Sequence, residues 1–99
     1  MLFQQGDVLI EACKEFPSGL TQSDSNHLAE GEVTGHFHKA VGEGVAVLEG
    51  DGEVYLDTPC GCDIVHQEHN CISVPSGRFE VRKVQEYDHF KEEARAVVD

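Results

Sequence analysis

Residues 45–58, VAVLEGDGEVYLDT, decide the fold class of this 99-residue chain. Two short runs rich in apolar residues, 45–50 and 53–58, flank the Gly-Asp-Gly sequence at 50–52. Asp-Gly suits the positive φ angles of a tight two-residue turn. The stretch therefore predicts an antiparallel β-hairpin.

Similar runs extend outward from this hairpin along the whole chain. They lie at 6–13, 27–38, 63–70, 71–77 and 78–87, and turn-forming residues such as those of 14–26 separate them. About seven short strands with little helix predict an all-β fold, either a small antiparallel β-barrel or a sandwich. The length fits one domain over 1–99. At its end, 88–99 is compatible with a short C-terminal helical turn that Asp88 would cap.

The charge balance excludes some classes of partner. Nineteen acidic side chains against seven basic ones give a net charge of −12. A nucleic-acid partner or an anionic membrane surface would need a basic face, so neither is expected. Five of the seven bases lie in 78–99, where we expect them to pair with neighbouring carboxylates.

The start of the chain predicts a cytoplasmic protein. Residues 1–13 have no basic region followed by a long apolar core, so they do not resemble a signal peptide. No run approaches the roughly 18 apolar residues that a membrane span needs. In a reducing compartment the four cysteines are expected as thiols or metal ligands, because disulfides are rare there.

Two histidine pairs are the strongest chemical signal in the sequence. His36 and His38 stand one residue apart in an extended run, and side chains at i and i+2 of a strand point to the same face. Two parallel imidazoles make half of a transition-metal site. His66 and His69 can supply the rest if their segment turns, and Glu43 is a further candidate ligand. These five residues predict a site for Zn, Ni, Fe or Mn.

The cysteines offer a competing site. Cys60 and Cys62 form a Cys-Gly-Cys turn, and Cys71 follows His69 closely. These four side chains could form a separate structural zinc site, although the spacing differs from the Cys-x-x-Cys pattern of zinc knuckles. Cys13 is expected to be a small core residue.

The stretch HFHKAVGEGVAVLEG resembles the first motif of the cupin superfamily. His36, His38, Glu43 and Gly50 match its His-x-His, Glu and Gly positions, and VPSG resembles the Pro-x-Gly turn of the second motif. The resemblance implies a small β-barrel that binds a divalent metal through the two histidines and Glu43. The sequence departs from the pattern where the second motif has histidine, because Glu80 stands there.

A second resemblance covers nearly the whole chain. The segments GDVLI, LAEGEVTGHFH, VHQEHNCISVPSGRFEV and VQEY are similar to a family of small uncharacterised bacterial proteins. That family keeps both histidine pairs, which favours His36, His38, His66 and His69 over Glu43 as ligands. The resemblance names no reaction.

Three functions are consistent with these patterns. The first is a small metal-binding β-barrel protein that uses both histidine pairs; four imidazoles nearly fill a tetrahedral zinc site but leave two positions open on octahedral iron or nickel. The second is a non-catalytic interaction module or homo-oligomer, formed through strand edges and the acidic surface. The third is a cupin-type metal-dependent enzyme. No substrate class follows from the sequence.

Overall fold

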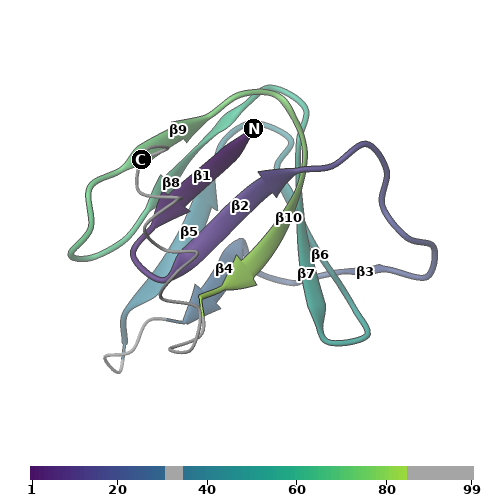
Figure 1. Ribbon diagram of the computed structural model, residues 1–99, viewed down its shortest axis with the longest axis horizontal. Helices are drawn as coiled ribbons and strands as arrows, with labels where there is room; N and C mark the ends of the chain where they lie inside the picture. Colours follow the sequence, from purple (N-terminus) through teal and green to yellow (C-terminus); the bar gives the residue numbers. More distant parts are fainter. Residues whose placement is uncertain (31–34, 85–99) are drawn as a thin grey trace.

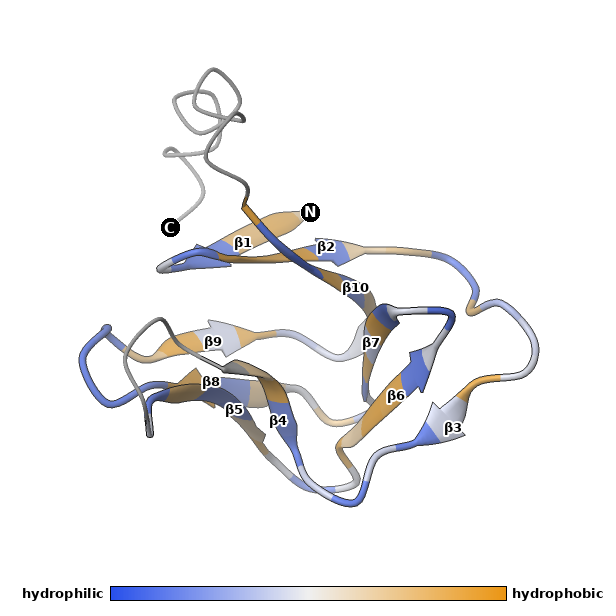
Figure 2. Ribbon diagram, turned by 90° about the horizontal axis from the view of Figure 1, so that it is seen from below, coloured by the Kyte–Doolittle hydropathy of each residue, from blue (hydrophilic) through white to orange (hydrophobic). Residues whose placement is uncertain are grey.

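Two antiparallel β-sheets face each other in the computed structural model, which describes residues 1–30 and 35–84 (Figures 1 and 2). The six-stranded sheet has the order β1 (Leu2–Gln5), β2 (Val8–Ala12), β10 (Gly77–Lys83), β7 (Glu53–Thr58), β6 (Ala46–Gly50) and β3 (Thr21–Gln22). The four-stranded sheet has the order β4 (His27–Glu30), β5 (Phe37–Val41), β8 (Cys62–Val65) and β9 (Ile72–Val74).

The hairpin predicted at 45–58 is confirmed. Strands β6 and β7 pair antiparallel, with Gly50 opposite Glu53. Asp51 and Gly52 form the turn with φ angles of 52° and 79°. Positive φ at both central positions is the type I′ geometry, whose twist matches that of the flanking strands.

The described residues form ten strands against about seven predicted, because one predicted strand is divided in two and because β1 and β3 lie outside the predicted runs. The run 6–13 begins in a turn, since Gly6 has a φ of 59°, and the residues before it form β1, which pairs with β2. The run 27–38 contains β4 and the start of β5, which run antiparallel, with Gly35 (φ 86°) between them. The helical turn predicted for 88–99 lies outside the described residues.

The fold is a sandwich and not a closed barrel. Figure 2 shows β1, β2 and β10 as one layer above β4, β5, β8 and β9, with β6 and β7 along one side. Side chains from both sheets meet in one apolar core, made of Val8, Ile10, Leu28, Ala40, Val47, Leu56, Cys62, Ile64, Val74, Phe79 and Val81. Alternate residues of each strand supply this core, which is the pattern of two sheets packed face to face.

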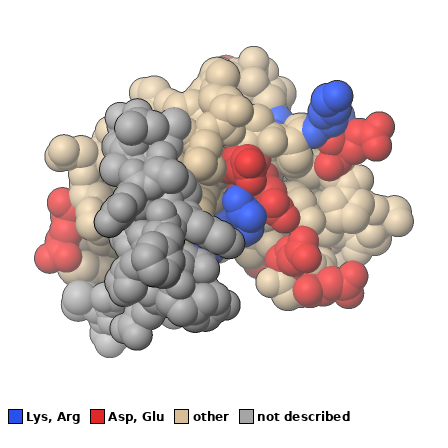
Figure 3. All heavy atoms as spheres, in the orientation of Figure 1, with Lys and Arg blue, Asp and Glu red and all other residues tan. Residues whose placement is uncertain are grey.

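Arg82 and Lys83 of the last strand lie beside carboxylates, as predicted, whereas Arg78 donates to the carbonyl of Lys14 at 3.4 Å. Lys91 and Arg95 lie outside the described residues. Arg82 of β10 donates to Glu11 of β2 at 2.6 Å, and Lys83 lies 3.8 Å from Asp7. Figure 3 shows basic side chains set among acidic ones on this face. The described segments contain no helix with the length and apolar character of a membrane span.

Candidate metal centre

Two chain segments, 36–38 and 66–69, bring the four predicted histidines together at one end of the sandwich. His38 follows the inward alternation of β5 and is only 1% exposed, whereas Phe37 faces outward and stacks on His27. His66 comes directly after β8, in line with the buried Ile64. The alternation of the two strands therefore delivers one imidazole each to the space between the sheets.

The imidazole rings are in mutual contact. The ring centres of His38 and His66 are 4.4 Å apart, those of His66 and His69 are 4.6 Å apart, and those of His38 and His69 are 6.0 Å apart. His36 lies at the outer side, with its ring centre 5.6 Å from that of His66. The two sequence-distant pairs thus form one group, called here the imidazole cluster.

A turn after β8 makes the second pair converge. Nδ1 of His66 accepts hydrogen bonds from the backbone N–H of Glu68 at 3.0 Å and of His69 at 3.3 Å. These bonds curl the chain so that His69 returns over the cluster. Its ring packs against Gly6, where any side chain would overlap Nε2 of His69.

Gln67 holds this loop to the segment that carries the first pair. Its Oε1 accepts from the N–H of Phe37 at 2.9 Å, and its Nε2 donates to the carbonyl of Gly35 at 3.2 Å. One amide side chain therefore pairs with the backbone on both sides of His36, much as a neighbouring strand would.

The side chain of Gln5 fixes the tautomer of His38. Gln5 is 3% exposed, and its Nε2 donates to the carbonyls of Ile64 at 2.8 Å and Asn70 at 2.9 Å. Its Oε1 must then be the atom that lies 2.8 Å from Nδ1 of His38, so this nitrogen carries the proton and donates. The lone pair of the neutral ring consequently lies on Nε2.

Nε2 of His38 is buried and has no hydrogen-bond partner among the described residues. The nearest charged group is Asp7, whose Oδ1 lies 3.4 Å away. A charge-assisted hydrogen bond would be about 2.7–2.9 Å long, so this contact is too long to be one. Two groups that both accept hydrogen bonds therefore face each other in the interior.

His36 and His66 differ in which ring nitrogen could bind an ion. Nδ1 of His36 faces Oε1 of Glu68 at 3.5 Å, and a proton held between these two atoms would leave Nε2 of His36 free to bind an ion. His66 already accepts two backbone bonds at Nδ1, so the proton of its neutral ring lies on Nε2. His66 must change its tautomer or turn its ring before it can bind an ion.

Burial keeps the central imidazoles neutral. It is the main cause that lowers the pKa of His38 to about 4, and the neighbouring His66 lowers it further, against the opposing effect of Asp7. The pKa of His66 is also lowered, first by desolvation and then by His69 and His36. Neutral imidazole is the form that binds metal ions.

The imidazole cluster does not yet have the geometry of a metal site. Within 1–30 and 35–84, no three His, Cys, Asp or Glu side chains already hold their donor atoms around one point. Side chains of the cluster would therefore have to rotate before their donor atoms could converge on one ion.

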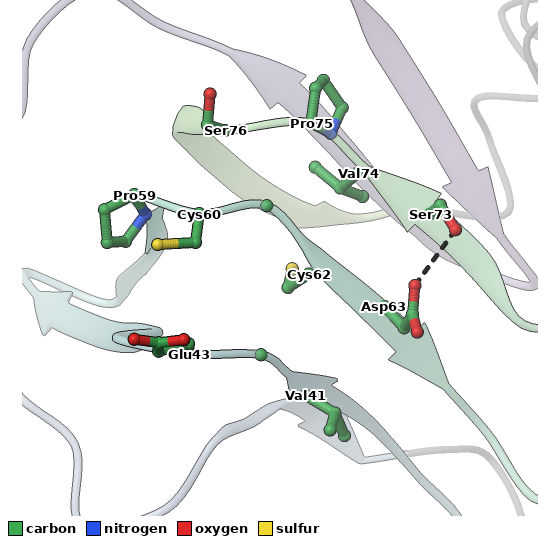
Figure 4. A pocket seen from close by; sticks show the side chains of 12 residues that line it. Val41, Glu43, Pro59, Cys60, Cys62, Asp63, Ser73, Val74, Pro75 and Ser76 are labelled. Carbon is green, nitrogen blue, oxygen red and sulfur yellow. Dashed lines mark hydrogen bonds between the residues drawn. The ribbon is translucent and has the colours of Figure 1, made fainter.

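Glu43 is not brought to the imidazole cluster. It is exposed and follows β5, whereas the histidines lie at the other end of that strand. Figure 4 shows Glu43 beside a different pocket of about 660 Å³, which is also lined by Cys60, Cys62 and the turn at Pro75 and Ser76. The cupin-like motif residues are therefore divided between the two ends of the sandwich.

The predicted cysteine site is not assembled either. Cys60 and Cys62 lie at the start of β8, whereas His69 and Cys71 lie in the loop after its other end. All four cysteines of the chain are free thiols. Cys62 is buried in the core, and this burial raises the pKa of its thiol.

Sequence reasoning missed the groups that surround His38. Gln5 and Asp7 come from the first hairpin, more than 30 residues before His38 and almost 60 or more before His66. A glutamine at an inward position of an apolar strand was one available signal, since buried polar side chains need partners. The Gly-Asp sequence of a tight turn was another, because it places a carboxylate at a strand end.

No curated protein and no solved structure matches this chain. A family model with the description Domain of unknown function (DUF8820) matches residues 4–84, which include Gln5, Asp7 and the whole imidazole cluster. Because the match covers most of its length, the chain belongs to this family of uncharacterised domains.

Proposed function

We propose that this protein binds one divalent transition-metal ion at the imidazole cluster, His36, His38, His66 and His69. The observation that carries the proposal is Nε2 of His38, a buried lone pair without a hydrogen-bond partner in the described part of the chain. Such an atom costs free energy unless something binds to it. A metal ion is the partner that neighbouring neutral imidazoles favour.

The ring separations support this proposal. With metal–nitrogen bonds of about 2.1 Å, the centres of two imidazoles on one ion are about 4.5 Å apart at right angles and about 6.5 Å apart when opposite. The three separations among His38, His66 and His69 run from 4.4 to 6.0 Å and fall almost wholly within this span. The cluster also has a second-sphere partner of the kind that orients metal-binding histidines, because Gln5 holds His38 through a hydrogen bond of 2.8 Å.

Nitrogen ligands of this kind accept zinc, nickel, iron or manganese and do not select among them. The expected ligand set contains no thiolate, which separates it from the sulfur-rich sites that hold zinc in zinc fingers. Glu43 is left out of this set because it lies at the opposite end of β5.

Metal analysis of protein purified without a histidine tag tests the proposal. The wild type should hold about one equivalent of metal, and His38→Gln should weaken binding at least about tenfold. His27→Gln is the matched control, because His27 stacks on Phe37 outside the cluster and should keep the wild-type content. Equal metal content in wild type and His38→Gln would reject the site, and anomalous scattering at metal edges would identify the element.

Self-association and cytoplasmic location remain predictions. The large apolar side chains that are exposed in the described residues are Met1 and Val41. Sedimentation with and without chelator would show whether an oligomer forms and whether it needs the metal. The free thiols fit a reducing compartment.

A further inference from the structure

On the basis of the metal site above, we propose that the carboxylate of Asp7 is a direct ligand of the ion and occupies the position next to His38. The proposal assigns the site a mixed nitrogen and oxygen donor set. It also places ligands on both sheets, since Asp7 belongs to the β1–β2 turn of the six-stranded sheet and His38 to β5 of the other.

Contacts of the β1–β2 turn hold the carboxylate of Asp7 at the imidazole cluster. Asp7 follows Gly6, whose missing side chain lets the His69 ring lie directly against the turn. The carbonyl of Asp7 accepts from the N–H of Val84 at 2.8 Å, which anchors the turn to the end of β10. Figures 1 and 2 show the turn between β1 and β2 beside the loop between β8 and β9, at the same end of the sandwich.

The distance between the two donor atoms fits a shared ion. Nε2 of His38 and Oδ1 of Asp7 are 3.4 Å apart. Two neighbouring ligand atoms bound at about 2.1 Å to a five-coordinate ion are separated by about 3.0 Å at 90° and about 3.6 Å at 120°, so the observed distance lies within this range. Because Gln5 holds the proton of His38 on Nδ1, a lone pair and a carboxylate oxygen face each other across this gap. A cation between them turns a repulsive contact into two bonds.

The ammonium group of Lys83 competes with a metal ion for the carboxylate of Asp7. Its Nζ lies 3.8 Å from Oδ2 of Asp7, the oxygen that does not face His38. The ammonium group lowers the negative potential that a metal ion would experience at Asp7. Removal of this charge should therefore strengthen metal binding.

Titration of the full-length protein with Zn²⁺ against a chromophoric chelator tests the proposal. Asp7→Asn, which keeps the size of the side chain, should weaken Zn²⁺ binding about 10- to 100-fold. Lys83→Met should strengthen it about 2- to 5-fold, in line with the small energies of exposed ion pairs. Asp24→Asn, an exposed carboxylate in the loop before β4, is the matched control and should bind like the wild type.

The outcomes separate the two proposals. If the wild type binds Zn²⁺ and Asp7→Asn binds it within twofold of the wild type, Asp7 is not a ligand, although the imidazole site stands. If the wild type binds none of the four candidate metals, both proposals fail. Should Asp7→Asn not fold, Lys83→Met decides, because unchanged or weaker binding in that variant would overturn the role of Asp7.

Discussion

At the scale of single residues, the histidine end of the sandwich depends on residues that each meet more than one structural requirement. Gly6 has a φ of 59° and also touches the His69 ring, so two requirements meet in one residue. Gln5 similarly satisfies two backbone carbonyls and one imidazole with a single amide group. A substitution at Gly6 or Gln5 would therefore lose at least one of these contacts or conformations.

Gly6→Ala tests whether the contact with His69 matters beyond the backbone. Positive φ alone costs an alanine about 1–2 kcal/mol. Gly19 has a φ of 84° with open space around it, so Gly19→Ala should show only this backbone cost. In Gly6→Ala the new methyl group would also displace the His69 ring, and because this side chain is exposed the added cost should be no more than about 1 kcal/mol. Urea denaturation of both variants measures the difference, and equal losses would contradict the packing of His69 on Gly6.

The sequence was most informative where a residue's role follows from its neighbours in the chain. His36 and His38 were found because alternation along a strand predicts direction from spacing alone. The convergence of His66 with His69 required a turn, and the Nδ1 bonds that form it were not visible in the sequence. Asp7 was missed because its approach to His38 depends on how the two sheets face each other, which no local pattern specifies.

At the scale of elements, the site is held by the connections between strands. The loop after β8 carries His66 and His69, and Gln67 ties this loop to the backbone beside β5. Loops that carry functional groups need such attachments, because otherwise they lose the positions of their side chains through motion.

Gln67→Ala should loosen this loop. The loss of one hydrogen bond to the N–H of Phe37, worth about 1 kcal/mol, should speed hydrogen exchange of that amide about fivefold. Gln67→Glu keeps the acceptor for Phe37 but removes the donor to Gly35, so the same amide should stay near its wild-type exchange rate. If the two variants give the same exchange rate at Phe37, Gln67 does not act through this bond.

The prediction of elements from sequence succeeded where turn chemistry was explicit. The Asp-Gly hairpin was identified because its two residues require positive φ. Strand β1 was not predicted, because Gly6 and Asp7 form the turn between two strands and not the start of one. Short strands such as β3, with two exposed residues, have no apolar pattern to reveal them.

At the scale of the whole molecule, the two sheets are joined by different forces at different places. The core between them is apolar. At the histidine end, Gln5 of β1 instead donates to the carbonyls of Ile64 and Asn70 across the sheets. An ion shared by Asp7 and His38 would add a second polar link there. Metal binding should therefore stabilise the folded chain, because it favours the folded state only.

The buried imidazole of His38 should make the metal-free protein sensitive to acid. Its pKa of about 4 in the folded protein lies below the ordinary value of 6.5, so the unfolded chain binds this proton more readily. The stability contribution is therefore complete above about pH 6.5 and is lost as the pH falls from there to about 4. Between pH 7.5 and 4.5 the loss should be roughly 2–3 kcal/mol.

Urea denaturation at these two pH values, with chelator present, isolates the contribution when wild type is compared with His38→Gln. Glutamine does not titrate, and the other ionisable groups, including His66, are present in both proteins. The wild type should lose more of its free energy of unfolding than the variant on acidification. Equal losses in the two proteins would mean that burial does not hold His38 neutral, and the lone pair proposed to bind the metal would then be protonated once the pH fell below about 6.5.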